Sequence, residues 1–337
     1  MKDFGFDVTN WTLRQTVIFL VIFFLIYGVG AWHFPEFRTL YSDPMALLEK
    51  KQWLQESPIQ YLVGYSLFGR LNAVGAYVLT QLVGIALLLV SYSLLLKNEH
   101  IKHSQLFLVL TLSPFLLTIF FWFGKADIFL VASCFGMLAT VKKNRFLFPF
   151  FLLISAFSHP QITAFYLLFF LILKQVRVDR LFLLSIIASS ALYAIYTYKL
   201  NADFGRADYM YDALLTLLKH HLKAPLFDLF STFGWLWLPI IYFRKSLSIR
   251  VYIVSFLCFV ITAFTLDHTR VFMLLSLPLL VYLSEEVDIV EYVKKASQFF
   301  PIWILLLFQF QKWNGVVYDT AWSTLWLGKL ARTLGFL

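Results

Sequence analysis

Charged side chains are scarce in this sequence: Asp, Glu, Lys and Arg make up 14% of its 337 residues, whereas 60% are hydrophobic. A soluble domain needs more polar surface than this balance supplies, so the composition excludes that class. The alternating polar and apolar strands of a membrane barrel are also lacking, because the apolar runs are continuous. The sequence therefore predicts an all-α fold, a polytopic transmembrane helical bundle without a soluble domain.

Motifs of the common soluble enzymes are lacking as well. The chain has no P-loop, no dinucleotide-binding glycine fingerprint on a strand–helix unit, no nucleophile elbow and no HExxH. Its two cysteines, Cys134 and Cys258, lie inside apolar runs, which argues against a disulfide framework, a metal knuckle or a catalytic thiol. The net charge of +9 is typical of basic cytoplasmic loops in a membrane protein and does not imply a nucleic-acid partner.

What the chain does contain is a series of apolar segments, about eleven in all, which we interpret as membrane spans; they include 71–96, 106–123 and 299–310. No small-residue cleavage site follows the first, at 13–31, so we expect it to be retained. Several others, such as 128–141 and 146–157, are shorter than the ~20 residues needed to cross ~30 Å of hydrocarbon. We interpret them as spans whose far ends stop short and leave a water-filled depression; arms of buried hairpins are the alternative. A single transmembrane domain over 1–337 is expected.

The first long loop, 32–58, is expected to carry helices that lie on the membrane surface. Asp43-Pro44 is typical of a helix start, with Asp at the N-cap and Pro at the first helical position. Apolar residues on one face of the following segment predict an amphipathic interfacial helix. The segment 59–68 is expected to continue it.

Basic residues alternate between the two ends of the spans. Two or three Lys or Arg residues occur in each of the short loops 97–104, 142–145, 174–180, 244–250 and 285–296. The corners between these loops hold at most one, so the positive-inside rule places the basic loops and the N-terminus in the cytoplasm. The predicted localisation is a multi-pass integral membrane protein, such as one of a bacterial inner membrane, with the corners and both long loops on the outer face.

Ionisable residues suited to binding or catalysis gather on this predicted outer side. Asp267, His268 and Arg270 share one corner between two uncharged runs. An ionised group in hydrocarbon costs at least about 2.5–3.5 kcal/mol, so these side chains are expected to face a cavity. A snorkelling Arg beside an Asp-capped helix is the alternative. The other candidates on this side are Glu36, Asp43, Lys125, Asp127, His159 and Arg206.

A cleft with these groups suits an anionic lipid headgroup and a polar substrate. Arg270 and Lys125 are expected to pair with phosphate, because Arg offers a two-pronged fork and Lys a point charge. Asp43 is the candidate general base toward an acceptor hydroxyl, with Glu36 next; a purely capping role for Asp43 is the alternative. His220-His221 is expected to be a solvated pair, because adjacent helical side chains diverge by about 100° and rarely chelate together.

The order of features along about 12–283 resembles the GT-C superfamily of polytopic glycosyltransferases. The features are an acidic first outer loop, Ser113-Pro114, a Gly-x-x-Asp corner at 124–127, short hairpins split by 142–145, Ser158-His159-Pro160 and a late Asp-x-x-Arg corner. The resemblance implies a polyprenyl-phosphate-linked sugar as donor on the outer leaflet, and a lipid or glycan acceptor in contact with membrane lipid. Residues 284–337 would add a last span and an amphipathic tail.

The same resemblance implies roles for individual residues. Asp43 would be the catalytic base, and Lys125, Asp127, His159 and Arg270 would line the donor pocket. The first loop departs from the family pattern because it has no Asp-x-Asp pair, so neither a divalent metal nor another cofactor is expected. The large soluble outer domain of some members is also missing.

Two other functions stay open. An outer-face polysaccharide polymerase of the Wzy or EpsG kind also joins lipid-linked sugars and would suit the Asp267–Arg270 corner. Its second outer loop is expected to hold several arginines, whereas 199–224 holds only Arg206. A transporter or lipid flippase is expected to have charges near the bilayer midplane and inverted repeats, and neither is evident in this sequence.

Overall fold

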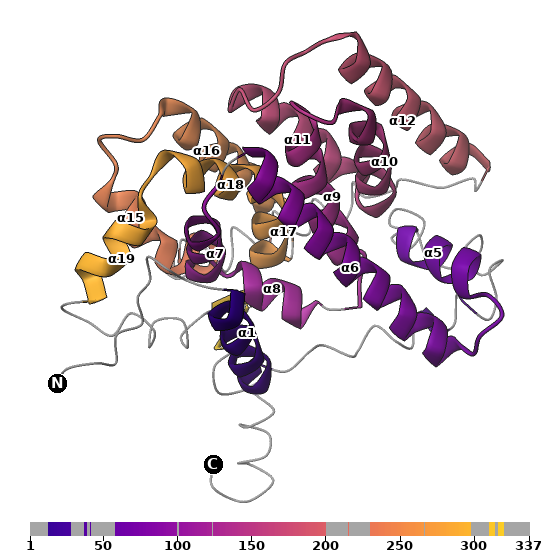
Figure 1. Cartoon of the computed structure of the whole chain (residues 1–337), viewed down its shortest axis with the longest axis horizontal. Helices are drawn as coiled ribbons and strands as arrows, with labels where there is room; N and C mark the ends of the chain where they lie inside the picture. Colours follow the sequence, from indigo (N-terminus) through magenta and orange to yellow (C-terminus); the bar gives the residue numbers. More distant parts are fainter. Residues whose placement is uncertain are drawn as a thin grey trace, which may run out of the picture. The chain divides into compact units, whose positions relative to one another are not determined.

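The computed structural model describes residues 13–27, 37–38, 41, 58–99, 101–122, 124–199, 215, 230–265, 267–297, 310–313 and 316–319. The regular structure in these residues is helical apart from one short antiparallel hairpin (Figure 1). The hairpin pairs β1 (Phe310–Trp313) with β2 (Val316–Asp319). The prediction of a helical fold is confirmed, and the hairpin is a local departure from it.

Two compact units alternate along the chain. Unit 1 comprises Met1–Val29, Ile101–Phe121 and Tyr209–Leu337, and unit 2 comprises Gly30–His100 and Trp122–Asp208. The backbone therefore passes from one unit to the other at four places. The expected extents of the transmembrane domain and of its glycosyltransferase-like module stay predictions.

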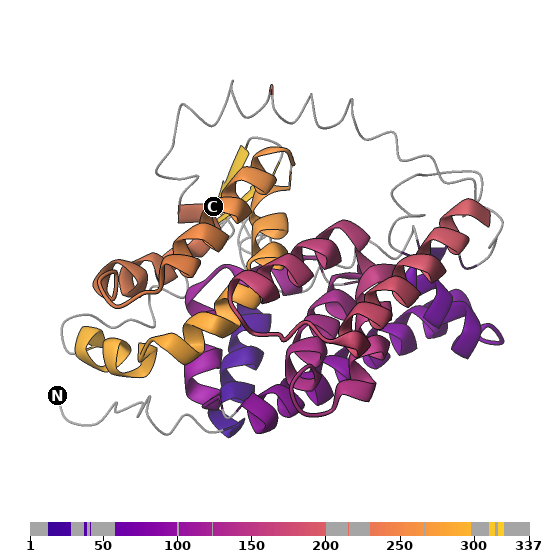
Figure 2. The same ribbon diagram turned by 90° about the horizontal axis from the view of Figure 1, so that it is seen from above.

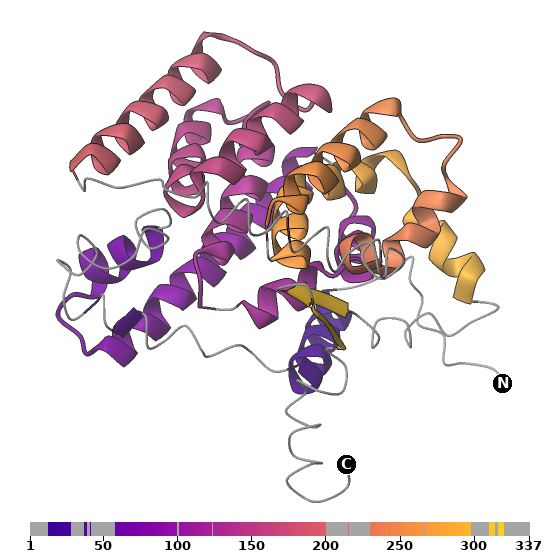
Figure 3. The same cartoon turned by 180° about the vertical axis from the view of Figure 1, so that it is seen from behind.

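Unit 2 is a bundle of helices centred on a parallel pair. Its elements are α5 (Ile59–Phe68), α6 (Ala73–Glu99), α9 (Asp127–Thr140), η2 (Arg145–Leu147), α10 (Phe148–Ser158), α11 (Pro160–Ile172) and α12 (Arg180–Lys199). Tyr77, near the start of α6, packs on Gly124, which precedes α9. Near the other ends of these helices, Asn98 Nδ2 donates a hydrogen bond of 2.8 Å to the Ala139 carbonyl. The two helices therefore run in the same direction. Figures 1 and 3 show α12 alongside α10, which it contacts.

Unit 1 collects the first helix and most of the C-terminal half. Its elements are α1 (Leu13–Tyr27), α7 (His103–Leu112), α8 (Phe115–Phe121), η4 (Gly234–Leu236), α15 (Trp237–Tyr242), α16 (Ile249–Ala263), α17 (His268–Leu275), α18 (Leu277–Glu286), α19 (Ile289–Ser297) and the hairpin. Aromatic packing joins α16 to α17, because the rings of Phe259 and Phe272 lie 5.0 Å apart. β1 lies against α17 (Figure 2).

The basic loops of unit 2 lie at one end of its bundle, as their alternation predicts. Lys142 pairs with Glu99 at the end of α6, and Arg145 pairs with Asp179 just before α12. The Phe148 and Phe182 rings, whose centroids lie 5.5 Å apart, pack beside the second pair. These contacts bring three of the predicted cytoplasmic loops together; which side of a membrane they face stays a prediction.

Among the described residues, two helices are long and apolar enough to cross a membrane: Ala73–Glu99 and Arg180–Tyr198. Only 28% and 22% of their most apolar windows are buried, whereas a core helix of a soluble protein is mostly buried. Faces of this kind, with Leu184 and Ile187 exposed, suit contact with lipid. Seven further apolar helices in the described part of the chain are shorter, at 10–17 residues. Length and composition thus favour membrane association, and the described helices do not establish eleven spans.

Candidate functional site

The corner that leads into α9 is built around Gly124. Its φ of +95° is one that glycine adopts readily and other residues rarely adopt. A Cβ at this position would lie 1.8 Å from the Tyr77 hydroxyl, so α6 and the corner before α9 approach each other closely. The chain then continues through Lys125, whose Nζ lies 4.8 Å from the centroid of the Trp122 ring. Helix α9 begins directly afterwards at Asp127, which is 2% exposed.

Asp127 faces His159 from the next corner of the same unit. Nε2 of His159 lies 4.0 Å from Oδ1 of Asp127. His159 is extended (φ −157°, ψ 91°), because the following residue, Pro160, disfavours helical geometry at the position before it. Pro160 then starts α11, so the imidazole stands between α10 and α11. A carboxylate and an imidazole at this separation can hold an ion pair or pass a proton through one bridging water.

Described parts of the first long loop pack on this same end of unit 2. Phe37 is fully buried, and its ring centroid lies 5.1 Å from that of Tyr77. Tyr41 stacks on Phe37 at 5.6 Å and donates a hydrogen bond of 2.9 Å to the Leu71 carbonyl. Because Tyr77 also packs on Gly124, this aromatic cluster joins the first loop to the Asp127 corner.

Three candidate residues lie outside the described residues: Glu36, Asp43 and Arg206. In the sequence, Glu36 directly precedes the buried Phe37, and Asp43 follows Tyr41 by two residues. The amphipathic helix expected after Asp43 also lies outside the described residues, whereas α5 occupies the segment in which we expect its continuation. The catalytic role of Asp43 stays a prediction.

The third corner, at the start of α17, belongs to unit 1. Arg270 Nη1 donates a hydrogen bond of 3.0 Å to Asp267 Oδ2, and the Arg270 side chain is 12% exposed. The Asp267 carboxylate makes no capping hydrogen bond within the described part of the helix. His268, the first residue of α17, is buried. This geometry is an enclosed ion pair, unlike the alternative of a capping Asp and a snorkelling Arg.

The structure therefore brings four of the predicted site residues together as two pairs, each within its own unit. Asp127 lies with His159 in unit 2, and Asp267 lies with Arg270 in unit 1. Their convergence in one cleft stays a prediction. Within the described ranges, no three His, Cys, Asp or Glu side chains gather in a metal-binding arrangement, so we assign no ligand set.

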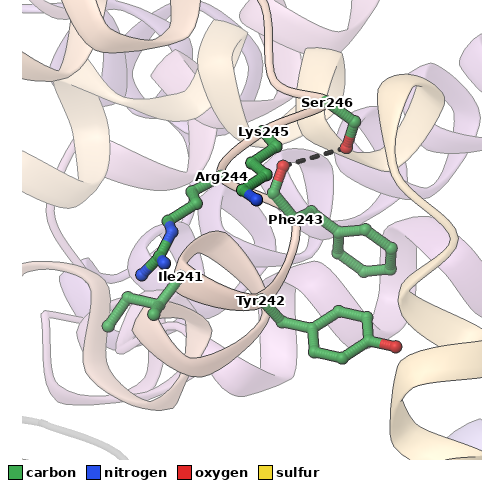
Figure 4. A pocket seen from close by; sticks show the side chains of 6 residues that line it. All are labelled: Ile241, Tyr242, Phe243, Arg244, Lys245 and Ser246. Atoms are coloured by element: carbon green, nitrogen blue, oxygen red, sulfur yellow. Dashed lines mark hydrogen bonds between the residues drawn. The ribbon is translucent and has the colours of Figure 1, made fainter.

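A hollow of about 380 Å³ lies elsewhere, at the basic end of unit 1 (Figure 4). Six consecutive residues, 241–246, line it, and the turn is fixed by a 2.9 Å hydrogen bond from the Ser246 hydroxyl to the Phe243 carbonyl. The Tyr242 ring lies 5.3 Å from that of Tyr292 in α19, which brings the last two basic loops together. None of the predicted site residues lines this hollow.

Two residues of α6 at the Asp127 end of unit 2 were not predicted from the sequence. They are Tyr77, which packs on Gly124, and Gln81, which is 3% exposed. A signal for Gln81 was available, because it is a carboxamide in a long apolar segment, where polar side chains are costly. Comparison of the chain with known protein families, curated proteins and solved structures finds no match.

Proposed function

We propose that the protein is a multi-pass membrane glycosyltransferase that moves a sugar from a polyprenyl-phosphate donor to a lipid or glycan acceptor on the outer face. The observation that carries the proposal is the gathering of Asp127 and His159 at one end of unit 2, opposite the ion-paired basic loops. By the positive-inside rule this end faces outward, as the resemblance to the GT-C superfamily also implies.

The chemistry of such a donor matches what this end of unit 2 offers. A polyprenyl-phosphate sugar combines a long apolar tail, a phosphate and a neutral polar ring. The exposed apolar faces of α6 and α12 suit the tail, and Lys125 supplies a cation for the phosphate. The buried carboxylate of Asp127 supplies an acceptor for hydroxyl groups of the ring.

We assign the reaction steps to residues of this chain as follows. Asp43 takes the proton from the acceptor hydroxyl, whose oxygen attacks the anomeric carbon of the sugar. The bond from that carbon to the phosphate oxygen breaks, and the electron pair leaves with the lipid phosphate. Lys125 stabilises the charge on the departing phosphate. The products are a glycosylated acceptor, the lipid phosphate and a protonated Asp43.

A transporter is the less favoured function on the same geometry. Asp127 is the first residue of α9, and His159 stands between two helices, so both groups lie at helix ends. Transport sites are expected near the bilayer midplane.

A polysaccharide polymerase is the other alternative. It shares the donor chemistry, and the Asp267–Arg270 pair also suits it. The length of the products distinguishes a polymerase from a transferase.

The test uses the purified full chain in proteoliposomes with a panel of radiolabelled polyprenyl-phosphate sugars and a lipid extract as acceptor. We expect transfer of one sugar per acceptor, whereas a ladder of products would indicate the polymerase. Asp127→Asn and His159→Ala should each lower kcat/KM about 10- to 100-fold, because the donor site loses a buried hydrogen-bonding group or the imidazole that faces it. Asp179→Asn, in the ion pair at the opposite end, is the matched control and should transfer normally. If the folded wild type transfers no sugar from any donor, the proposal is wrong.

A further inference from the structure

One face of α6 buries a glutamine whose side chain forms no hydrogen bond with any residue that the structure describes. Gln81 is 3% exposed, and neither its amide nitrogen nor its carbonyl oxygen has a hydrogen-bond partner within the described part of the chain. The neighbouring Thr80 is satisfied by its own helix, because its hydroxyl donates to the Ala76 carbonyl at 2.7 Å. Buried polar groups are paired in nearly all proteins, so two unmade bonds on one carboxamide need a physical explanation.

The position of Gln81 gives that explanation. Tyr77 and Gly84 lie on the same helix face, four residues before it and three residues after it. Tyr77 packs on Gly124, and a Cβ at Gly84 would lie 2.7 Å from a side-chain atom of Ile128. Gln81 therefore lies at the level of the chain between Gly124 and Ile128, the stretch that carries Asp127.

A second buried amide with an unmade hydrogen bond lies on α5, which packs against α6. Gln60 of α5 is buried, and its carbonyl oxygen also has no hydrogen-bond partner among the described residues. It lies one turn before Gly64, at which a Cβ would be 3.1 Å from the Thr80 hydroxyl oxygen. Both α5 and α6 therefore carry a buried side-chain amide with at least one atom that pairs with no described residue.

We propose that Gln81 binds the sugar ring of the donor, donating one hydrogen bond and accepting another from neighbouring hydroxyl groups. The inference rests on the proposed glycosyltransferase function and names a specificity-determining residue for it. A carboxamide carries a donor and an acceptor side by side without charge, so it suits a pair of hydroxyls and not a phosphate. In an enclosed site without water, these bonds discriminate strongly against a ligand that lacks them.

The experiment compares two buried glutamines that differ in pairing. Gln105 Nε2 donates to Asp288 Oδ1 at 2.8 Å, and its carbonyl oxygen accepts from the Val290 amide. Hydrogen bonds from the Glu291 backbone amide and from Gln105 lower the pKa of Asp288, as expected for a satisfied carboxylate. Gln105→Leu breaks hydrogen bonds that the free protein forms. Gln81→Leu removes polar atoms that pair with no described residue.

Two results are expected from Gln81→Leu. The ligand-free variant should melt at or a few degrees above the wild type, because the unmet amide is gone, whereas Gln105→Leu should melt lower. For sugar transfer, kcat/KM should fall about 10- to 100-fold in Gln81→Leu and stay at the wild-type value in Gln105→Leu. A melting temperature of ligand-free Gln81→Leu as low as that of Gln105→Leu would show that the amide is satisfied in the free protein and would overturn the proposal.

A binding measurement separates this proposal from the proposed reaction. The melting temperature of the wild type is measured with a polyprenyl-phosphate sugar and with the same lipid phosphate without sugar. We expect extra stabilisation by the sugar-bearing lipid, and its loss in Gln81→Leu. Equal stabilisation by both lipids would overturn the role of Gln81 even if transfer occurs. Sugar-dependent stabilisation without transfer would overturn the proposed reaction and leave the binding role.

Discussion

Replacing Gly124 by alanine tests the geometry of the Asp127 corner most directly. A side chain at φ +95° is strained by about 1–3 kcal/mol. The new Cβ would also lie 1.8 Å from the Tyr77 hydroxyl, and overpacking of this kind costs typically about 1–3 kcal/mol. Together these penalties predict a loss of about 2–6 kcal/mol, a large part of the ~5–15 kcal/mol that stabilises an ordinary protein. At roughly 2 °C per kcal/mol, the melting temperature should fall by about 4–12 °C.

The two penalties are separated by a second substitution. Tyr77→Phe removes the colliding hydroxyl and leaves Cζ as the nearest ring atom, 3.0 Å from the new Cβ. The double variant should therefore regain the stability lost to the collision and keep the loss caused by backbone strain. The coupling free energy between the two substitutions should be about 1–3 kcal/mol. Thermal unfolding in detergent, followed by tryptophan fluorescence, measures the wild type, both single variants and the double variant.

The control is a glycine on α6 without these constraints. Gly75 lies near the start of that helix, and the nearest atom to a Cβ there would be the Asn72 side-chain oxygen, at 3.3 Å. Gly75→Ala should change stability by no more than about 1 kcal/mol. A Gly124→Ala protein that melts like the wild type, or a double variant no more stable than Gly124→Ala, would refute the close packing of Tyr77 on the corner.

Three further predictions follow from the corners and loops. Asp43→Asn should lower turnover by about 10²-fold or more without unfolding the protein; ordinary activity would remove Asp43 as the base and make Glu36 the next candidate. Arg270→Lys should raise the donor KM or lower kcat, because Lys keeps the charge but loses the two-pronged geometry with which Arg is expected to hold a phosphate; indistinguishable donor curves would contradict a phosphate contact. Asn144→Cys in intact cells should resist an impermeant thiol reagent, with the wild type, whose free cysteines are buried, as the blank; labelling would reverse the assigned orientation.

Much of the helical framework could be predicted because membrane-length apolar runs leave little ambiguity. The expected span 71–96 corresponds to α6, and the segment 128–141 differs from α9 by one residue at each end. The expected span 106–123 was less accurate, because the structure divides it into α7 and α8 at Ser113-Pro114. Proline lacks the backbone N–H and its ring clashes with the carbonyl four residues earlier, so hydropathy alone misses such a break.

The hairpin was missed for a different reason. Phe310 ends the expected apolar span 299–310, and that expectation gives no weight to the Asn314-Gly315 dipeptide that follows. Asn-Gly between two apolar stretches is the strongest short-range signal for a hairpin. At the site, the individual corner residues could be predicted from their charge, whereas the 4.0 Å approach of His159 to Asp127 depends on helix packing that no spacing encodes.

The alternation of the two units along the chain constrains how the protein can be made and divided. Translation delivers the N-terminal helix of unit 1 first, yet the last segment of that unit, Tyr209–Leu337, emerges only after all of unit 2. Helix α6 is likewise separated from its parallel neighbour α9 during synthesis. Residues Ile101–Phe121, which belong to unit 1, are translated between them. No cut between neighbouring residues yields a fragment that contains one whole unit and nothing else. Expression of isolated halves should therefore fail, and complementation by split fragments should succeed only when both pieces are produced together.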